Sequence, residues 1–121
     1  MAHRILIVDD SPAVRQSVRA YIENQTDWQV CGEAEDGAIA VAKVKELSPD
    51  IVILDLHMPV MNGLEAARQI SRIAPGTFML MFTMYGTEQF QGTAKAAGIN
   101  AIFSKSTALS DVVLAVRQVM E

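Results

Sequence analysis

The sequence has little of three things: cysteine, long apolar runs and clustered basic residues. Its one thiol, Cys31, cannot form an internal disulfide, and without a second thiol or spaced histidines it makes no metal site, so we expect a small core residue. The longest apolar run falls far short of the roughly 20 residues that a membrane-spanning helix needs. The N-terminus also lacks the apolar region and cleavage site of a signal peptide. These absences predict a cytoplasmic domain that does not contact a membrane.

The charge and length narrow the class of protein further. The formal net charge is -4 at pH 7, whereas a chain that binds nucleic acid by itself carries a basic patch. We therefore expect any contact with DNA to go through an attached domain outside this sequence. Half of the 121 residues are hydrophobic, which suits one folded domain over residues 1–121 and argues against disorder.

Short apolar runs alternate with segments of helical period along the whole chain. The runs with strand length and composition are RILIV (4–8), WQVCGEA (28–34), IVIL (51–54), FMLMF (78–82) and AIFS (101–104). Parallel strands need crossover connections, and helices supply them here, so the pattern predicts an α/β fold with a doubly wound parallel five-stranded sheet. Ligands of such folds bind beyond the carboxyl ends of the strands.

The helices between these runs have recognisable beginnings. The first is predicted to begin after Ser11 as its N-terminal cap, the second after Asp36 and the third after Asn62. The fourth, over residues 87–97, is predicted to be the weakest, because Phe90 is its only large apolar anchor. Its Gly92 costs about 1 kcal/mol relative to alanine. We expect this helix to be the most mobile of the five.

Polar side chains stand at the ends of four of the five predicted strands. Asp9 and Asp10 end the first, Asp55 the third, Thr83 the fourth and Lys105 the fifth. Three carboxylates at one edge would repel one another unless a cation compensates, and ligands that offer only oxygen favour a hard ion such as Mg²⁺. A carboxylate beside Mg²⁺, a hydroxyl and an ammonium is equipped to accept a phosphoryl group.

Each of these residues also has a purely structural explanation when it is taken alone. An aspartate after a strand often forms a turn or caps a helix, as Asp9 or Asp10 would. Thr83 could be an ordinary β-branched strand residue and Lys105 a solvated strand end. The combination in this order is what favours the functional interpretation.

The sequence resembles the receiver domain of bacterial two-component response regulators over essentially its whole length. The matching segments are ILIVDDSP (5–12), PDIVILDLHMPVMNG (49–63), MFT (81–83) and IFSK (102–105). The resemblance implies a flavodoxin-like (βα)5 fold with strand order 2-1-3-4-5. It also implies phosphorylation of one aspartate by a sensor histidine kinase, and a possible homodimer of the phosphorylated form.

The same resemblance assigns roles to individual residues. Asp55 would be the phosphorylated residue. Asp9, Asp10 and Asp55 would bind Mg²⁺ together with the backbone carbonyl of His57. Thr83 and Lys105 would contact the phosphoryl group and transmit the change.

The sequence departs from the family pattern at three positions. Ile102 stands where many receivers have Tyr or Phe, so an aromatic ring cannot swing inward there. Ser106 replaces a common proline and is similar to the subset joined to helix-turn-helix DNA-binding domains, the NarL/FixJ/LuxR type. Met84 stands where a small residue is usual, and we hypothesise that it partly shields the phosphoryl group. His57 and Tyr85 occupy positions that resemble family sites tuning phosphoryl lifetime.

Three functional hypotheses follow from the sequence. The first is a phosphoryl-accepting signalling domain that does not turn over substrate, either joined to a DNA-binding domain or free-standing in a phosphorelay. The second is a phosphatase of the haloacid-dehalogenase type, although His57 stands where that family usually has a second aspartate. The third is a flavodoxin-like cofactor binder, although the DDSPAV loop places carboxylates where an anion would sit.

Overall fold

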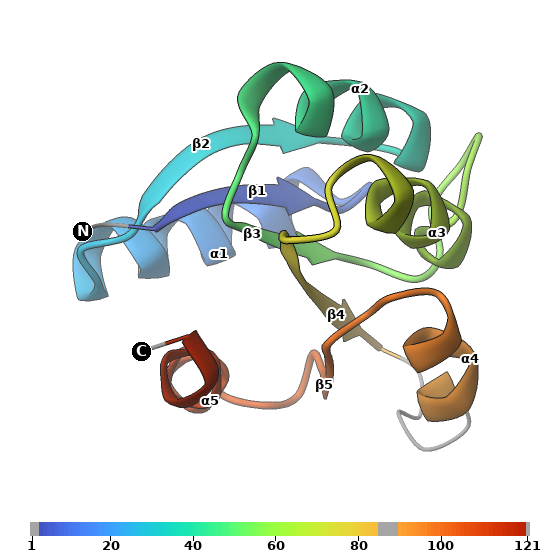
Figure 1. The fold of residues 1–121 in the computed structure, drawn as a ribbon. Helices are drawn as coiled ribbons and strands as arrows, with labels where there is room; N and C mark the ends of the chain where they lie inside the picture. The colour runs from blue at the N-terminus through green and yellow to red at the C-terminus, as the bar shows by residue number, and fades with distance from the viewer. Residues whose placement is uncertain (1–2, 85–89, 121) are drawn as a thin grey trace.

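Five parallel strands form one sheet in the order β2-β1-β3-β4-β5 (Figure 1). This computed structural model describes residues 3–84 and 90–120. The strands are β1 (Arg4–Val8), β2 (Gln29–Ala34), β3 (Ile51–Leu54), β4 (Phe78–Thr83) and β5 (Ala101–Ser104). Each agrees with its predicted run to within one residue. The predicted fold class and strand order are therefore confirmed.

The connecting helices cover both faces of this sheet. They are α1 (Pro12–Gln25), α2 (Gly37–Leu47), α3 (Gly63–Ile73), α4 (Gln91–Ala96) and α5 (Leu109–Met120). One core cluster includes residues of α2, α3 and α4, whereas the other includes residues of α1 and α5 (Figure 1). The sheet is thus the middle layer of three. Among residues 3–84 and 90–120, no helix is both long and apolar enough to cross a membrane.

The central strand β1 is buried on both sides. Its Leu6 and Val8 belong to the core cluster beneath α2, α3 and α4, while Ile5 and Ile7 belong to the cluster beneath α1 and α5. This division arises because successive side chains of a strand point to opposite faces. All four are at most 1% exposed, and burial of such a side chain stabilises the fold by about 1.5–3 kcal/mol. Two packed cores fix the position of the strand end that follows.

The first three helices begin where the sequence predicts, after Ser11, Asp36 and Asn62. Ser11 Oγ accepts from the amide of Val14 at 3.3 Å, and Asp36 Oδ1 accepts from the amide of Ile39 at 2.9 Å. Asn62 caps α3 in the same way. The fourth helix is described from Gln91, so its predicted beginning at residue 87 lies outside the described residues.

The prediction that Cys31 is a core residue is wrong. The side chain is half-buried, because β2 is an edge strand with a single neighbour in the sheet. Its thiol lies 3.4 Å from the carbonyl oxygen of Ile5, to which it can donate. Partial burial raises the pKa of this thiol, which lowers its reactivity.

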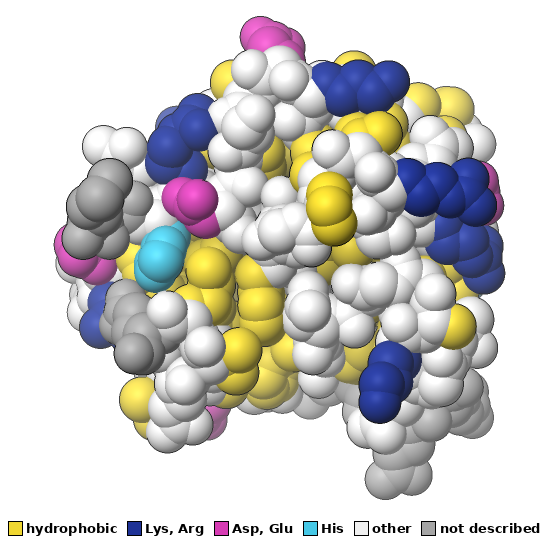
Figure 2. Space-filling model, viewed as in Figure 1, with side chains coloured by type: hydrophobic (Ala, Val, Ile, Leu, Met, Phe, Trp, Pro, Cys, Tyr) yellow, Lys and Arg dark blue, Asp and Glu magenta, His cyan; other side chains and the backbone are white. Residues whose placement is uncertain are grey.

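Charged side chains are distributed over the surface. Figure 2 shows Lys and Arg side chains spread over several parts of the viewed face, with apolar and uncharged groups between them. This face therefore carries no continuous basic surface of the kind that binds nucleic acid.

Candidate functional site

Three carboxylates meet at the carboxyl end of the sheet. One oxygen each of Asp9, Asp10 and Asp55 lie within 4.8 Å of one another. They meet because β1 and β3 are parallel neighbours in which Val8 pairs with Leu54. The amide of Asp55 donates to the carbonyl of Val8 at 3.0 Å, which extends this pairing by one residue. The structure thus brings together the carboxylates that the sequence predicted to converge.

Asp55 is held in a buried position. Its side chain is 9% exposed, Oδ1 accepts from the amide of Leu56 at 2.8 Å, and Oδ2 lies 3.3 Å from Lys105 Nζ. Burial, followed by the negative charge of Asp9, raises the pKa of this carboxyl group above its usual range. Lys105 opposes both effects and does not cancel them. A further cation at this position would relieve that repulsion.

Asp9 is buried beside the same lysine. Its Oδ2 lies 2.7 Å from Lys105 Nζ, and its Oδ1 accepts from the amide of Ser11 at 2.9 Å. Burial by itself would lower the pKa of Lys105, but the hydrogen bond to Asp9 and the charges of Asp9 and Asp55 outweigh it and raise that pKa. The lysine is therefore charged and lies between two carboxylates.

Thr83 and Lys105 are joined to each other through the backbone. The amide of Lys105 donates to the carbonyl of Thr83 at 2.7 Å, just beyond the pairing of Thr83 with Ser104. Thr83 has no exposed surface. The two residues proposed to contact a phosphoryl group thus belong to one hydrogen-bonded pair of strand ends, and Lys105 also reaches the carboxylates of Asp9 and Asp55.

The loop after Asp55 is anchored by a glycine. The amide of Gly63 donates to the carbonyl of Leu56 at 2.8 Å. A Cβ at position 63 would lie 2.0 Å from the carbonyl oxygen of Asp55, so only glycine permits this approach. Within the same loop Val60 has φ of 67°, a left-handed conformation that is unusual for a β-branched residue, and it is 85% exposed.

The remaining residues singled out in the sequence have different surroundings. His57 lies in the loop after Asp55 with an exposed side chain, and Tyr85 lies outside the described residues. Met84 is 79% exposed, and the hypothesis that it partly shields the phosphoryl group stays a prediction. Ile102 is half-buried and packs against the core cluster beneath α4. Ser106 is exposed, and the described residues contain no cis peptide bond.

One residue beside the site was missed in the sequence. Arg15, on the second turn of α1, donates from Nη1 to the backbone carbonyl of Asp9. It also pairs with Glu33 on β2. No local sequence pattern links positions 9, 15 and 33, because the contact depends on how α1 crosses the sheet.

The donor atoms at this site suit a hard divalent cation. Three carboxylates and one ammonium leave an excess of negative charge, and all of the candidate side-chain ligands are oxygens. Two of the carboxylates are buried, whereas Asp10 is exposed and open to solvent. Mg²⁺ prefers such a site, since it uses one or two carboxylates and keeps several waters.

The fold and the site define a doubly wound α/β domain with a cluster of three carboxylates at the carboxyl ends of its central strands. The family model of the response regulator receiver domain matches residues 5–117. The chain therefore belongs to the response regulator receiver domain family.

Similarity to known proteins in sequence and in structure supports this assignment. The chain is 36% identical over 118 residues to the response regulator protein VraR of Staphylococcus aureus, covering 98% of this chain and 56% of VraR. It thus spans about half the length of the curated relatives that it matches. A LuxR-family two-component response regulator from Aurantimonas sp. SI85-9A1 superposes with a TM-score of 0.91 at 34% identity, covering 98% of this chain and 85% of that one.

A further similar structure is a complex that contains BeF3 and Mg²⁺. The structure of the CheX-CheY-BeF3-Mg+2 complex from Borrelia burgdorferi matches with a TM-score of 0.90 at 27% identity, covering 98% of this chain and 90% of the other.

Proposed function

We propose that this chain is the phosphoryl-accepting domain of a two-component system, with Asp55 as the acceptor and a sensor histidine kinase as the donor. The observation that carries the proposal is the placement of Asp55. Its carboxylate is buried, lies within 4.8 Å of those of Asp9 and Asp10, and is 3.3 Å from the ammonium of Lys105. A merely structural aspartate would not need two further carboxylates and a lysine around it.

The carboxylates of Asp9, Asp10 and Asp55, with the backbone carbonyl of His57, would hold Mg²⁺. When bound, this ion supplies positive charge against the oxygens of the transferred phosphoryl group. The excess of negative charge at the site supports this assignment, and so does the relative solved with BeF3 and Mg²⁺.

Transfer then makes one bond and breaks another. A carboxylate oxygen of Asp55 attacks the phosphorus of a phosphohistidine, the new O–P bond forms as the N–P bond breaks, and the imidazole of the kinase leaves with the electron pair. Lys105, already 3.3 Å from this carboxylate, is placed to neutralise charge on the phosphoryl oxygens. The chain is an acceptor in this reaction and does not turn over a substrate.

Transmission of the change would begin at Thr83. A phosphoryl group offers oxygens to the Thr83 hydroxyl and the Lys105 ammonium. Because Thr83 ends β4 and Lys105 follows β5, a shift of either moves the strand ends that flank α4. Such a shift would change which partner or second subunit binds the surface formed by α4 and β5.

We further propose that the whole protein regulates transcription and that it is located in the cytoplasm. The chain corresponds to about half of VraR, and its relatives include LuxR-family regulators, so we propose that residues 1–121 are joined to a DNA-binding domain. A homodimer of the phosphorylated form would then place two such domains on DNA. A free-standing receiver that acts by contact with another protein is the second candidate, favoured by CheY among the structural relatives.

The proposal is tested by the intact mass of the protein after incubation with acetyl phosphate, with and without Mg²⁺, for wild type and Asp55→Ala. We expect a phosphoryl adduct that requires Mg²⁺ and is absent from the variant. An adduct that survives in Asp55→Ala would place the acceptor elsewhere. Continuous release of inorganic phosphate from many phosphate esters would instead favour the phosphatase.

A further inference from the structure

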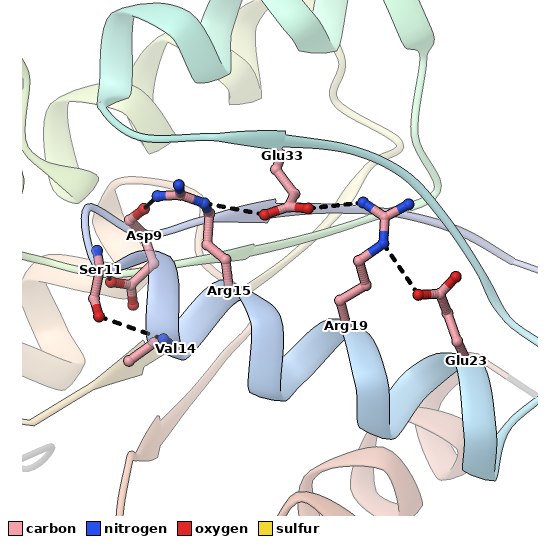
Figure 3. Close-up of polar contacts among 7 residues, drawn as sticks. All are labelled: Asp9, Ser11, Val14, Arg15, Arg19, Glu23 and Glu33. Atoms are coloured by element: carbon pink, nitrogen blue, oxygen red, sulfur yellow. Dashed lines mark hydrogen bonds and ion pairs between the residues drawn. The ribbon is translucent and has the colours of Figure 1, made fainter.

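A network of ion pairs and one hydrogen bond to a backbone carbonyl connects α1, the end of β1 and the edge strand β2. Figure 3 shows Arg15 and Arg19 pointing from α1 toward Glu33, with Arg15 also directed at Asp9. Arg15 and Arg19 are four residues apart and so lie on one side of the helix. They share a single carboxylate and differ in what else they touch.

Arg15 is held at two points. Its Nη1 donates to the carbonyl oxygen of Asp9 at 2.5 Å, and its Nε donates to Glu33 Oε1 at 3.0 Å. The side chain is only 16% exposed. Arg19 uses the other oxygen of Glu33, at 2.7 Å, and contacts Glu23 instead of the site. Arg15 is thus the member of the network that touches the acidic cluster.

The hydrogen bond from Arg15 to the Asp9 carbonyl adds a further restraint to the loop between β1 and α1. The Asp9 carboxylate accepts from the Ser11 amide at 2.9 Å and contacts Lys105 at 2.7 Å. The Asp9 carbonyl would otherwise have freedom to rotate with the peptide that leads to Asp10. With Arg15 on that carbonyl, the peptide between the two acidic residues is held from outside the cluster.

Glu33 keeps Arg15 in this position. Partial burial by itself would raise the pKa of Glu33, but the hydrogen bonds from Arg19 and Arg15 outweigh it and lower that pKa. Glu33 is therefore ionised at neutral pH. A rigid guanidinium that bridges a carboxylate and a carbonyl cannot be replaced by lysine, which has one nitrogen.

We propose that Arg15 is a positioning residue for the cation site, which orients Asp9 and Asp10 through the backbone carbonyl of Asp9 and is itself fixed by Glu33. This inference rests on the proposed binding of Mg²⁺ by those carboxylates. Residues that orient metal ligands typically change metal affinity by about 10- to 100-fold when they are removed. A contact to a ligand's backbone belongs at the lower end of that range.

The test is calorimetric titration of MgCl₂ into wild type, Arg15→Met and Arg19→Met, each with its thermal unfolding midpoint measured without Mg²⁺. Arg19→Met is the matched control, since it removes a bond to the same Glu33 from the same helix without touching Asp9. We expect Arg15→Met to raise the Kd for Mg²⁺ by about tenfold. Arg19→Met should change that Kd by less than about twofold, because the bonds of Arg19 go to Glu33 and Glu23 instead of Asp9.

A second variant guards against misfolding of Arg15→Met. Glu33→Gln leaves the Asp9 contact of Arg15 in place and removes its charged anchor, so the Kd should rise by a smaller factor than in Arg15→Met. Equal Mg²⁺ affinity in wild type, Arg15→Met and Glu33→Gln would overturn the positioning role of Arg15 and leave the proposed function intact. Absence of Mg²⁺ binding by wild type would overturn the proposed function together with it.

Discussion

The helices that follow β3 and β4 differ sharply in how they are attached. α3 has 11 residues, a side-chain cap from Asn62 and four buried positions. α4 has 6 residues, no side-chain cap at Phe90 and one buried residue, Ala94. Each follows a strand whose end carries a site residue, Asp55 before α3 and Thr83 before α4. The proposed acceptor therefore precedes a firmly held helix, and Thr83 precedes a weakly held one.

This difference suits a switch. A receiver must keep its acceptor in place while charge is added, and it must let another element respond to that charge. Elements with few buried contacts open at low free-energy cost. We therefore expect that a small free energy at the site redistributes α4 without disturbing α3.

The largest expected effect is a loss of stability in the loop that joins Asp55 to α3. A Cβ in Gly63→Ala would lie 2.0 Å from the carbonyl oxygen of Asp55, which forces the acceptor loop to move. We expect a loss of about 3 kcal/mol in the free energy of unfolding, measured by urea denaturation. Gly76→Ala is the control, because a Cβ there meets nothing within 4 Å. Equal stability of the two variants would show that the loop tolerates the added atom.

Removing the acceptor charge should stabilise the domain. Since the pKa of Asp55 is raised by burial and by Asp9, the folded state binds the proton more tightly than the unfolded state. The cost of the ionised carboxylate is present above the folded pKa and disappears below the unfolded pKa of about 4. Asp55→Asn should therefore raise the thermal unfolding midpoint at neutral pH by a few degrees, and this gain should vanish near pH 3, at about one unit below that value.

The measurement is thermal unfolding of both proteins across that pH range without Mg²⁺. Asp27→Asn serves as a control on an exposed carboxylate, whose side chain is 74% exposed and lies 3.6 Å from Arg117. A midpoint for Asp55→Asn that falls below wild type at neutral pH would mean that the Lys105 contact outweighs burial and repulsion.

A third change relieves strain inside the acceptor loop. Val60 has φ of 67° and is 85% exposed, so it contributes little packing and adopts a costly conformation. Asparagine tolerates this conformation, and Val60→Asn should add about 1 kcal/mol to the free energy of unfolding. Val119→Asn, at a 71% exposed position of α5, should change it little. A loss of stability in Val60→Asn would show that the valine side chain makes a stabilising contact at this position.

The smallest effect concerns the weakly held helix. Gly92 lies in α4, and a Cβ there meets nothing within 4 Å. Gly92→Ala should stabilise α4 by up to about 1 kcal/mol and slow amide hydrogen exchange in residues 91–96. Exchange in α3 should not change. Unaltered exchange in α4 would mean that its opening is not limited by helix propensity.

The strands and helix beginnings could be predicted because they depend on local sequence. Apolar runs defined the strands, and Ser11, Asp36 and Asn62 each cap the helix that follows. The convergence of Asp9, Asp10 and Asp55 was predictable too, since parallel strands end at one edge.

Contacts between distant elements could not be predicted in this way. Nothing local shows that Lys105 lies nearer to Asp9, at 2.7 Å, than to Asp55, at 3.3 Å. The pairing of Arg15 with Glu33 depends on the position of α1 over the sheet. Cys31 is half-buried because β2 lies at the edge, which composition alone does not reveal.

The central claim is that phosphorylation of a fixed acceptor is expressed at the weakly held side of the domain. We would measure amide hydrogen exchange of wild type and Thr83→Ala with Mg²⁺, in the presence and absence of excess acetyl phosphate. We expect phosphorylation to change exchange in α4 and β5 but not in α3 of wild type, and we expect Thr83→Ala to be phosphorylated with a much smaller change. A change centred on α3, or an equal response of Thr83→Ala, would contradict this claim.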